Sequence, residues 1–312
     1  MVGRSFLFSL AVSALAGCTS APRYETIIRG GTVYDGTGTA GVVADVAIAG
    51  DRIAAVGDLS GAEAGSVIDA SGQAVAPGFI NVLSWATETL IEDRRGESDL
   101  LQGVTLEVFG EGWSMGPLND AMKAESVKRQ GDIKFDIAWT TLGEYLGHLE
   151  TRGVSPNVAS YVGATTARIH ELGYADRAPT QAELFRMQEL VRAAMREGAL
   201  GVGASLIYAP AFYAKTDELI ALTKAAAEFG GGYIAHMRSE GDRYLEAIDE
   251  TIAIARAADT HAQIYHLKPA GRSNWDKSAA GLAKLDAARA DGVDVTANIY
   301  TYTAGATGLY AT

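Results

Sequence analysis

The stretch from Tyr233 to Lys268 constrains the fold of this chain more than any other part of the sequence. It contains two short β-type segments, and each ends in a histidine, at His236 and at His266. Residues 242–259, between the histidines, have the apolar spacing of one amphipathic helix. Strand, helix and strand in this order predict neighbouring parallel strands, whose C-terminal ends face the same side of a sheet. We therefore expect the two histidines to converge as a metal-ligand pair or a catalytic pair.

The scarcity of histidine strengthens this interpretation. A single histidine at the end of a strand is more often a satisfied core residue than a ligand. The chain has five histidines, however, and two of them occupy matching places in successive strand–helix units. The other three, His148, His170 and His261, fall in helix-like or loop-like segments and are interpreted as surface residues.

Composition sets wider limits. With 312 residues and 48% hydrophobic content, the chain can bury a large core and form more than one domain. Its formal net charge of -12 argues against a surface for nucleic acid or anionic membrane, which would need basic patches. The expected partner is a small molecule, and the charge does not identify it.

The first residues have the form of a lipoprotein signal. Arg4 is followed by an apolar segment over 6–15, which is too short to span a bilayer. Small residues then precede Cys18, the single cysteine, which cannot form an intrachain disulfide. We expect a signal peptide over 1–17, lipid on Cys18, a tether over 18–23 and a place in the bacterial cell envelope, facing the periplasm. The alternative is a plain secretory signal with an incidental cysteine.

Two domains follow. Residues 24–78 contain short alternating segments and turn signals without a helical period, which predicts a small β-sandwich. Residues 79–312 alternate strands with helices, which predicts an α/β domain on a parallel sheet. Seven strands are predicted there, beginning at Phe79 and then over 103–111, 157–163, 198–207, 232–236, 262–266 and 294–300.

The sheet is either a closed (β/α)8 barrel or an open, doubly wound sheet. Polar residues recur at the ends of many successive strands, which favours the barrel, because an open sheet concentrates its site at one switch point. A closed barrel needs an eighth strand. We therefore expect this sequence to be truncated at its C-terminus.

Several segments carry a family resemblance. Those over 28–38, 51–57 and 75–80 resemble the opening of the amidohydrolase superfamily. Other segments resemble one family of this superfamily, the N-acyl-D-amino-acid deacylases (D-aminoacylases). These segments are 98–105, 206–210, 235–241, 266–268 and 300–305. The resemblance implies a metal-bearing (β/α)8 barrel, with a small β-domain formed from both ends of the chain. The implied reaction is hydrolysis of an N-acyl bond on a D-amino acid.

The resemblance also assigns residues. His236 and His266 match the two zinc ligands at strand ends, whereas Lys268 and Tyr300 match positions that contact substrate. At other positions this sequence departs from the family's pattern. The family's His-x-His pair, which holds a second and weaker metal, is replaced by Leu83 and Trp85.

Two further positions differ from the family. Its bridging cysteine falls at Gly112, where the neighbouring Glu111 is the only residue able to act as a ligand. Its catalytic aspartate, the general base, is expected beyond Thr312. A serine that would follow Tyr300 is replaced by Ala306.

Amide hydrolysis needs an activated water and an electrophile for the carbonyl, and zinc supplies both. His236, His266 and Glu111 would form a His2Glu ligand set, and without the His-x-His pair we expect one zinc ion. The alternative for Glu111 is a solvated acid in a turn. Lys268, on the same strand face as His266, either holds a substrate carboxylate or is a surface lysine. Tyr300 either donates to the substrate carbonyl or packs in the core.

Arg238 and Glu240, close after His236, are expected either to pair with each other or to orient the site.

Three functions remain open from the sequence. The first is a zinc-dependent deacylase of N-acyl-D-amino acids. The second is another amide or cyclic-amide hydrolase on the same barrel. The third is a binding protein that has lost the metal together with the histidines replaced by Leu83 and Trp85.

Overall fold

The computed structural model describes residues 23–307. The predicted signal peptide, the lipidation site at Cys18 and all but the last residue of the tether lie outside the described residues. The chain divides into two compact units, the first ending at Pro77 and the second starting at Gly78. None of the helices in the described part of the chain is long and apolar enough to cross a membrane.

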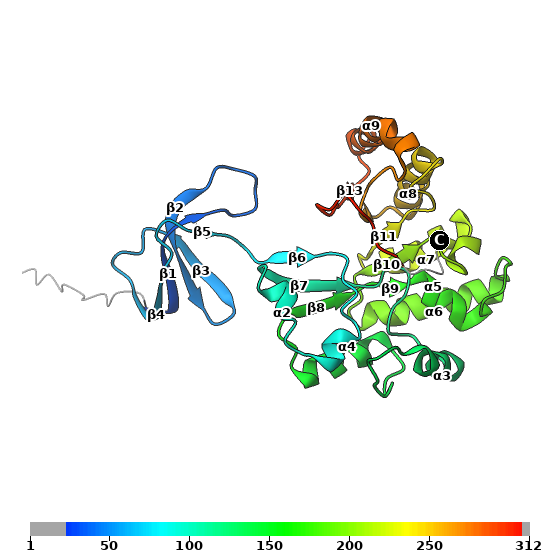
Figure 1. Ribbon diagram of the computed structural model, residues 1–312, viewed down its shortest axis with the longest axis horizontal. Helices are drawn as coiled ribbons and strands as arrows, with labels where there is room; N and C mark the ends of the chain where they lie inside the picture. Colours follow the sequence, from blue (N-terminus) through cyan, green and yellow to red (C-terminus); the bar gives the residue numbers. More distant parts are fainter. Residues whose placement is uncertain (1–22, 308–312) are drawn as a thin grey trace, which may run out of the picture. The chain divides into compact units, whose positions relative to one another are not determined.

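The first unit is one five-stranded sheet. Its strands are β1 (Arg23–Val33), β2 (Val42–Ala49), β3 (Arg52–Gly57), β4 (Glu63–Asp69) and β5 (Ala74–Val75). The order is β3-β2-β1-β4, with β5 also pairing with β1. The pairs β1–β2 and β2–β3 are antiparallel, whereas β4 and β5 run parallel to β1 (Figure 1).

The sandwich predicted for 24–78 is not formed by these residues, because a sandwich requires a second sheet. Alternation of apolar and polar residues identifies strands but does not say how many sheets they form. Ile27 and Ala47 are fully buried in the sheet, while Val43 and Ile53 remain exposed. The unit therefore leaves apolar side chains uncovered.

The second unit is built on parallel strands, and the predicted α/β class is confirmed. The strands are β6 (Phe79–Asn81), β7 (Val104–Phe109), β8 (Asn157–Ser160), β9 (Val162–Gly163), β10 (Gly201–Ser205), β11 (Gly232–His236), β12 (Ala262–Ile264) and β13 (Val295–Ala297). They form two sheets, β6-β7-β8 and β13-β12-β11-β10-β9, in which every pair is parallel and strands pair in chain order. The strand predicted over 157–163 is interrupted at Tyr161.

Helices connect these strands. They are α1 (Thr89–Glu92), α2 (Glu97–Leu100), α3 (Asp120–Arg129), α4 (Leu142–Arg152), α5 (Ala164–Leu172), α6 (Gln181–Arg196), α7 (Thr216–Ala227), α8 (Tyr244–Ala258) and α9 (Ser278–Ala290), with the 3-10 helices η1 (Ala211–Tyr213) and η2 (Arg272–Lys277). At the start of α6, Thr180 and Glu183 form a capping box, in which each side chain bonds to a backbone N–H of the other residue. The helix expected over 242–259 is α8.

Two apolar clusters surround the sheets. The larger one joins buried side chains of β9–β13 to those of helices α5–α9, which pack against the sheet. The smaller one contains Val108, Tyr161, Ile234 and Tyr265, with Leu83 packed against it. Ile234 precedes His236 by two residues on β11, so both side chains lie on the same face of the sheet. The small cluster therefore forms an apolar layer next to the two histidines.

Candidate metal centre

Three buried side chains meet at the C-terminal ends of the strands. Glu111 follows β7, His236 ends β11 and His266 follows β12. Glu111 Oε1 lies 3.0 Å from Nδ1 of His236 and 3.3 Å from Nε2 of His266. The two imidazole rings are 4.5 Å apart, at an angle of 81°. One ligand atom from each residue lies within 4.8 Å of the others. The convergence predicted for the histidines is therefore present, and Glu111 joins them instead of facing solvent.

Glycines allow the backbone around Glu111 to reach this place. Gly110 and Gly112, on either side, have φ angles of +105° and +76°, which favour glycine. A Cβ added to Gly203 on β10 would lie 1.9 Å from the carbonyl oxygen of Gly110. A Cβ on Gly163 would lie 2.2 Å from the carbonyl oxygen of Gly112. Segment 110–112 thus rests directly on the backbone of β9 and β10, which holds the carboxylate beside the histidines.

His266 has a strained backbone conformation, and hydrogen bonds to Asn298 hold it in place. Its φ of +37° is unusual for a residue with a side chain, and such conformations concentrate at functional sites. The backbone N–H of His266 donates to Asn298 Oδ1 at 2.8 Å, and the N–H of Leu267 donates to the carbonyl oxygen of Asn298 at 2.8 Å. Sequence reasoning missed Asn298, which lies just after β13. Its polar side chain at a strand end was the available signal.

Glu240 was expected to pair with Arg238 or to orient the site, and the structure favours the second role. Arg238 instead contacts Glu250, with 2.9 Å between Nη2 and Oε1. Glu240 Oε1 lies 2.8 Å from His266 Nδ1 and 2.7 Å from Lys268 Nζ. With Nδ1–H donated to Glu240, Nε2 of His266 would become a metal ligand once it loses the proton that it donates to Glu111.

The charges of the cluster reinforce one another. Burial alone would raise the pKa of Glu111, but hydrogen bonds to His236 and His266 outweigh it and lower this pKa to about 2. Burial likewise opposes the hydrogen bonds of Glu240 to His266 and Lys268, yet its pKa is lowered. Burial opposes a charge on His266 too, but its bonds to Glu111 and Glu240 raise its pKa. Both carboxylates are thus anionic at neutral pH, whereas a metal ion would have to displace a proton from His266 in order to bind it.

The two predicted substrate residues lie beside the cluster. Lys268 is not a free surface lysine, because it bonds to Glu240 and its Nζ lies 5.2 Å from the ring centre of Tyr300. The ring of Tyr300 lies 6.3 Å from that of His266. The structure therefore places both residues at the site, and their contact with substrate stays a prediction.

The donor set suits a divalent metal ion. Nε2 of His236 is buried and has no hydrogen-bond partner among the described residues, which is costly for a polar atom unless a ligand is bound. Two imidazole nitrogens and one carboxylate oxygen form a ligand set that zinc takes in hydrolases. That His236, His266 and Glu111 bind a metal stays a prediction, and the geometry agrees with it.

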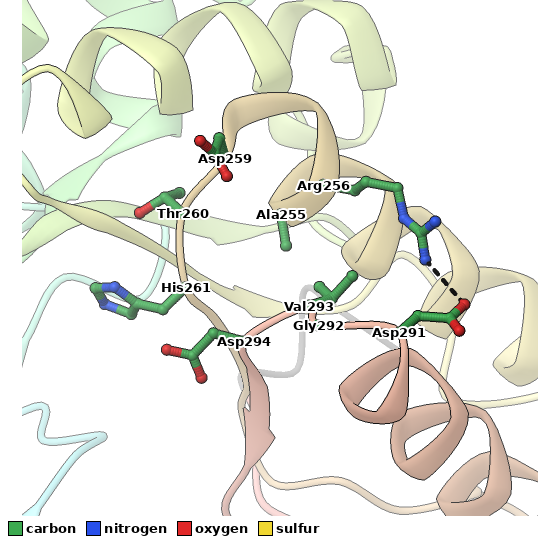
Figure 2. A pocket seen from close by; sticks show the side chains of 9 residues that line it. All are labelled: Ala255, Arg256, Asp259, Thr260, His261, Asp291, Gly292, Val293 and Asp294. Carbon is green, nitrogen blue, oxygen red and sulfur yellow. Dashed lines mark ion pairs between the residues drawn. The ribbon is translucent and has the colours of Figure 1, made fainter.

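A hollow elsewhere on this unit does not belong to the site. It has a volume of about 290 Å3 and is lined by residues 255, 256, 259–261 and 291–294 (Figure 2). His261 and Asp294 lie just before β12 and β13, so the hollow opens at the N-terminal ends of these strands. The histidine cluster lies at the opposite ends.

Replacement of Glu240 by alanine is expected to weaken zinc binding about 10- to 100-fold, the usual cost of removing the partner of a metal-bound histidine. Equilibrium dialysis of the full-length protein against buffered zinc measures the affinity. The Glu240→Gln variant keeps an acceptor oxygen for His266 Nδ1 and should lose less. Equal losses in both variants would mean that the negative charge matters, and not the hydrogen bond; no loss in either would contradict the role.

The sequence of this chain is similar to those of known metal-dependent hydrolases. No protein-family model matches the chain. The D-aminoacylase of Alcaligenes xylosoxydans xylosoxydans is 36% identical over 290 residues, which cover 92% of this chain. The chain is a homologue of the D-aminoacylases, which form a subset of the amidohydrolases. The family resemblance of the sequence motifs is thereby confirmed. The matched part amounts to 59% of that relative, so the chain spans about three fifths of its length.

Solved structures of the family superpose closely. A D-aminoacylase studied for its binuclear metal centre has a TM-score of 0.81 at 36% identity. The N-acyl-D-glutamate deacylase of Bordetella bronchiseptica, solved with zinc and a phosphonate inhibitor that mimics the tetrahedral intermediate, has a TM-score of 0.80 at 33% identity. Both matches cover 90% of this chain and 59% of the other chain.

Proposed function

We propose that the whole protein is a metal-dependent hydrolase of amide carbon–nitrogen bonds that deacylates N-acyl-D-amino acids. One observation carries the proposal: a buried carboxylate and two histidines meet at the C-terminal ends of parallel strands, with ligand atoms within 4.8 Å of one another. The names of the relatives, D-aminoacylase and N-acyl-D-glutamate deacylase, support the substrate class.

The residues of this chain would have separate roles in the reaction. Zinc, when bound, supplies an activated water and polarises the carbonyl. Glu111, His236 and His266 would hold the ion. Lys268 would attract the carboxylate of the amino acid, in competition with Glu240, and Tyr300 would line the substrate's path. The general base is still expected beyond Thr312.

The fold of the whole protein is proposed to be a (β/α)8 barrel with a β-domain completed from both ends of the chain. Pairing of parallel strands in chain order supports it, as does the exposure of Phe79 and Ile80 on the edge strand β6. Attachment to the cell envelope through lipid on Cys18 is proposed on the sequence alone.

A test uses the full-length mature protein, with and without chelator treatment, on matched N-acetyl-D- and N-acetyl-L-amino acids and on a cyclic amide. The expected result is release of the D-amino acid, abolished by chelation and restored by one equivalent of zinc. Turnover of the cyclic amide alone would favour the second function inferred from the sequence. Zinc binding without turnover of any substrate would refute the deacylase, and absence of zinc would favour a non-catalytic binding protein.

A further inference from the structure

We propose that Trp85 restricts this site to a single metal ion by occupying the carboxylate oxygen of Glu111 that a second ion would need. The inference rests on the metal site of the proposed function and deepens it. Trp85 would act as a positioning residue for the carboxylate of Glu111, to which its indole donates.

The two oxygens of Glu111 have separate partners. Oε1 faces both histidines, at 3.0 Å from His236 Nδ1 and 3.3 Å from His266 Nε2. Oε2 accepts a hydrogen bond from the indole Nε1–H of Trp85 at 3.0 Å. An indole is a donor only and has no lone pair to offer a cation. The carboxylate can therefore serve one ion through Oε1, while a proton of Trp85 points at Oε2.

The backbone next to Trp85 is fixed, so this hydrogen bond is built into the fold. Ser84 is buried, and its N–H donates to the carbonyl oxygen of Val108 on β7 at 2.9 Å. Its hydroxyl donates to Glu107 Oε2 at 2.6 Å and accepts from the N–H of Ala86 at 3.1 Å. Glu111 follows the same strand. Trp85 is thus attached to the strand that leads to its acceptor.

The neighbouring position cannot replace the lost ligand. Leu83 packs against the small apolar cluster that includes Val108, Ile234 and Tyr265. Its side chain has no atom that binds a metal. Of the two positions, one is therefore part of an apolar layer and the other is a hydrogen-bond donor. A D-aminoacylase studied for its binuclear metal centre has a TM-score of 0.81 to this chain.

The test is equilibrium dialysis of the full-length protein against buffered zinc, with metal and protein quantified in each sample. Wild type is expected to bind one ion. The Trp85→Phe variant keeps the ring but loses the N–H, and its single ion should bind about tenfold more weakly. The Leu83→His/Trp85→His variant should bind two ions. Trp275→Phe is the matched control, because Trp275 is 61% exposed against 59% for Trp85 and stacks on Arg272 instead.

The outcomes separate the two proposals. Absence of zinc from wild type would refute the proposed function itself. Two ions in wild type, or Trp85→Phe binding one ion as tightly as wild type, would overturn the inference and leave the hydrolase intact. One ion in a folded Leu83→His/Trp85→His variant would also overturn it. If that variant unfolds by circular dichroism, the Trp85→Phe affinity decides.

Discussion

Alanine at His236 or at His266 is expected to remove bound zinc from the full-length protein. Each substitution leaves two ligands, and the loss should exceed the roughly 100-fold that follows when only a ligand's hydrogen-bond partner is removed. Zinc per chain, measured after dialysis against nanomolar free metal, should fall from one to near zero. Hydrolysis of N-acyl-D-amino acids should fall with it.

The control is His170→Ala, which removes a half-buried histidine that bonds to Glu171 on helix α5. It should retain the full zinc content. Circular dichroism should show that both site variants keep the fold, since most of the core lies in the larger apolar cluster. Folded His236→Ala or His266→Ala protein with wild-type zinc content would refute the assignment of that histidine as a ligand.

Replacement of Gly203 by alanine is expected to lower the free energy of unfolding by about 3 kcal/mol, at the upper end for overpacking of a core. The new Cβ would meet the carbonyl oxygen of Gly110 at 1.9 Å, and a backbone atom cannot turn aside as a side chain does. Relief of the clash would displace segment 110–112 and Glu111 with it. Urea unfolding measures the stability, and zinc affinity should fall in parallel.

Gly147→Ala provides the comparison for this second variant. Gly147 lies within helix α4 and has open space where a Cβ would be added. Alanine there should stabilise the protein by about 0.5–1 kcal/mol through helix propensity. A Gly203→Ala protein as stable as wild type would show that β10 and segment 110–112 do not rest on each other.

The sequence predicted the histidine pair because strand, helix and strand in series place strand ends together. It left Glu111 undecided between ligand and solvated acid, since a turn residue has no periodicity that fixes its direction. The glycines around it, which decide its place, act through contacts of segment 110–112 with β9 and β10 that are remote in sequence. Asn298 and the role of Glu240 depend on similar distant contacts.

Trp85 shows a different limit. The family resemblance implies a histidine at its position, whereas the structure reveals the hydrogen bond that Trp85 makes to Glu111. In the first unit, the alternating pattern indicated β-structure but not the number of sheets. Side-chain alternation reports which face is apolar, and not what covers that face.

A metal ion bound by the cluster would also act as a cross-link. Glu111 is 125 residues from His236 and 155 from His266 along the chain. It follows a strand of the three-stranded sheet, and both histidines come from strands of the five-stranded sheet. An ion bound by all three would join the two sheets and close long stretches of chain between its ligands, as a disulfide does. The chain has a single cysteine and cannot form an intrachain disulfide. The bound metal would then stabilise the fold as well as take part in catalysis.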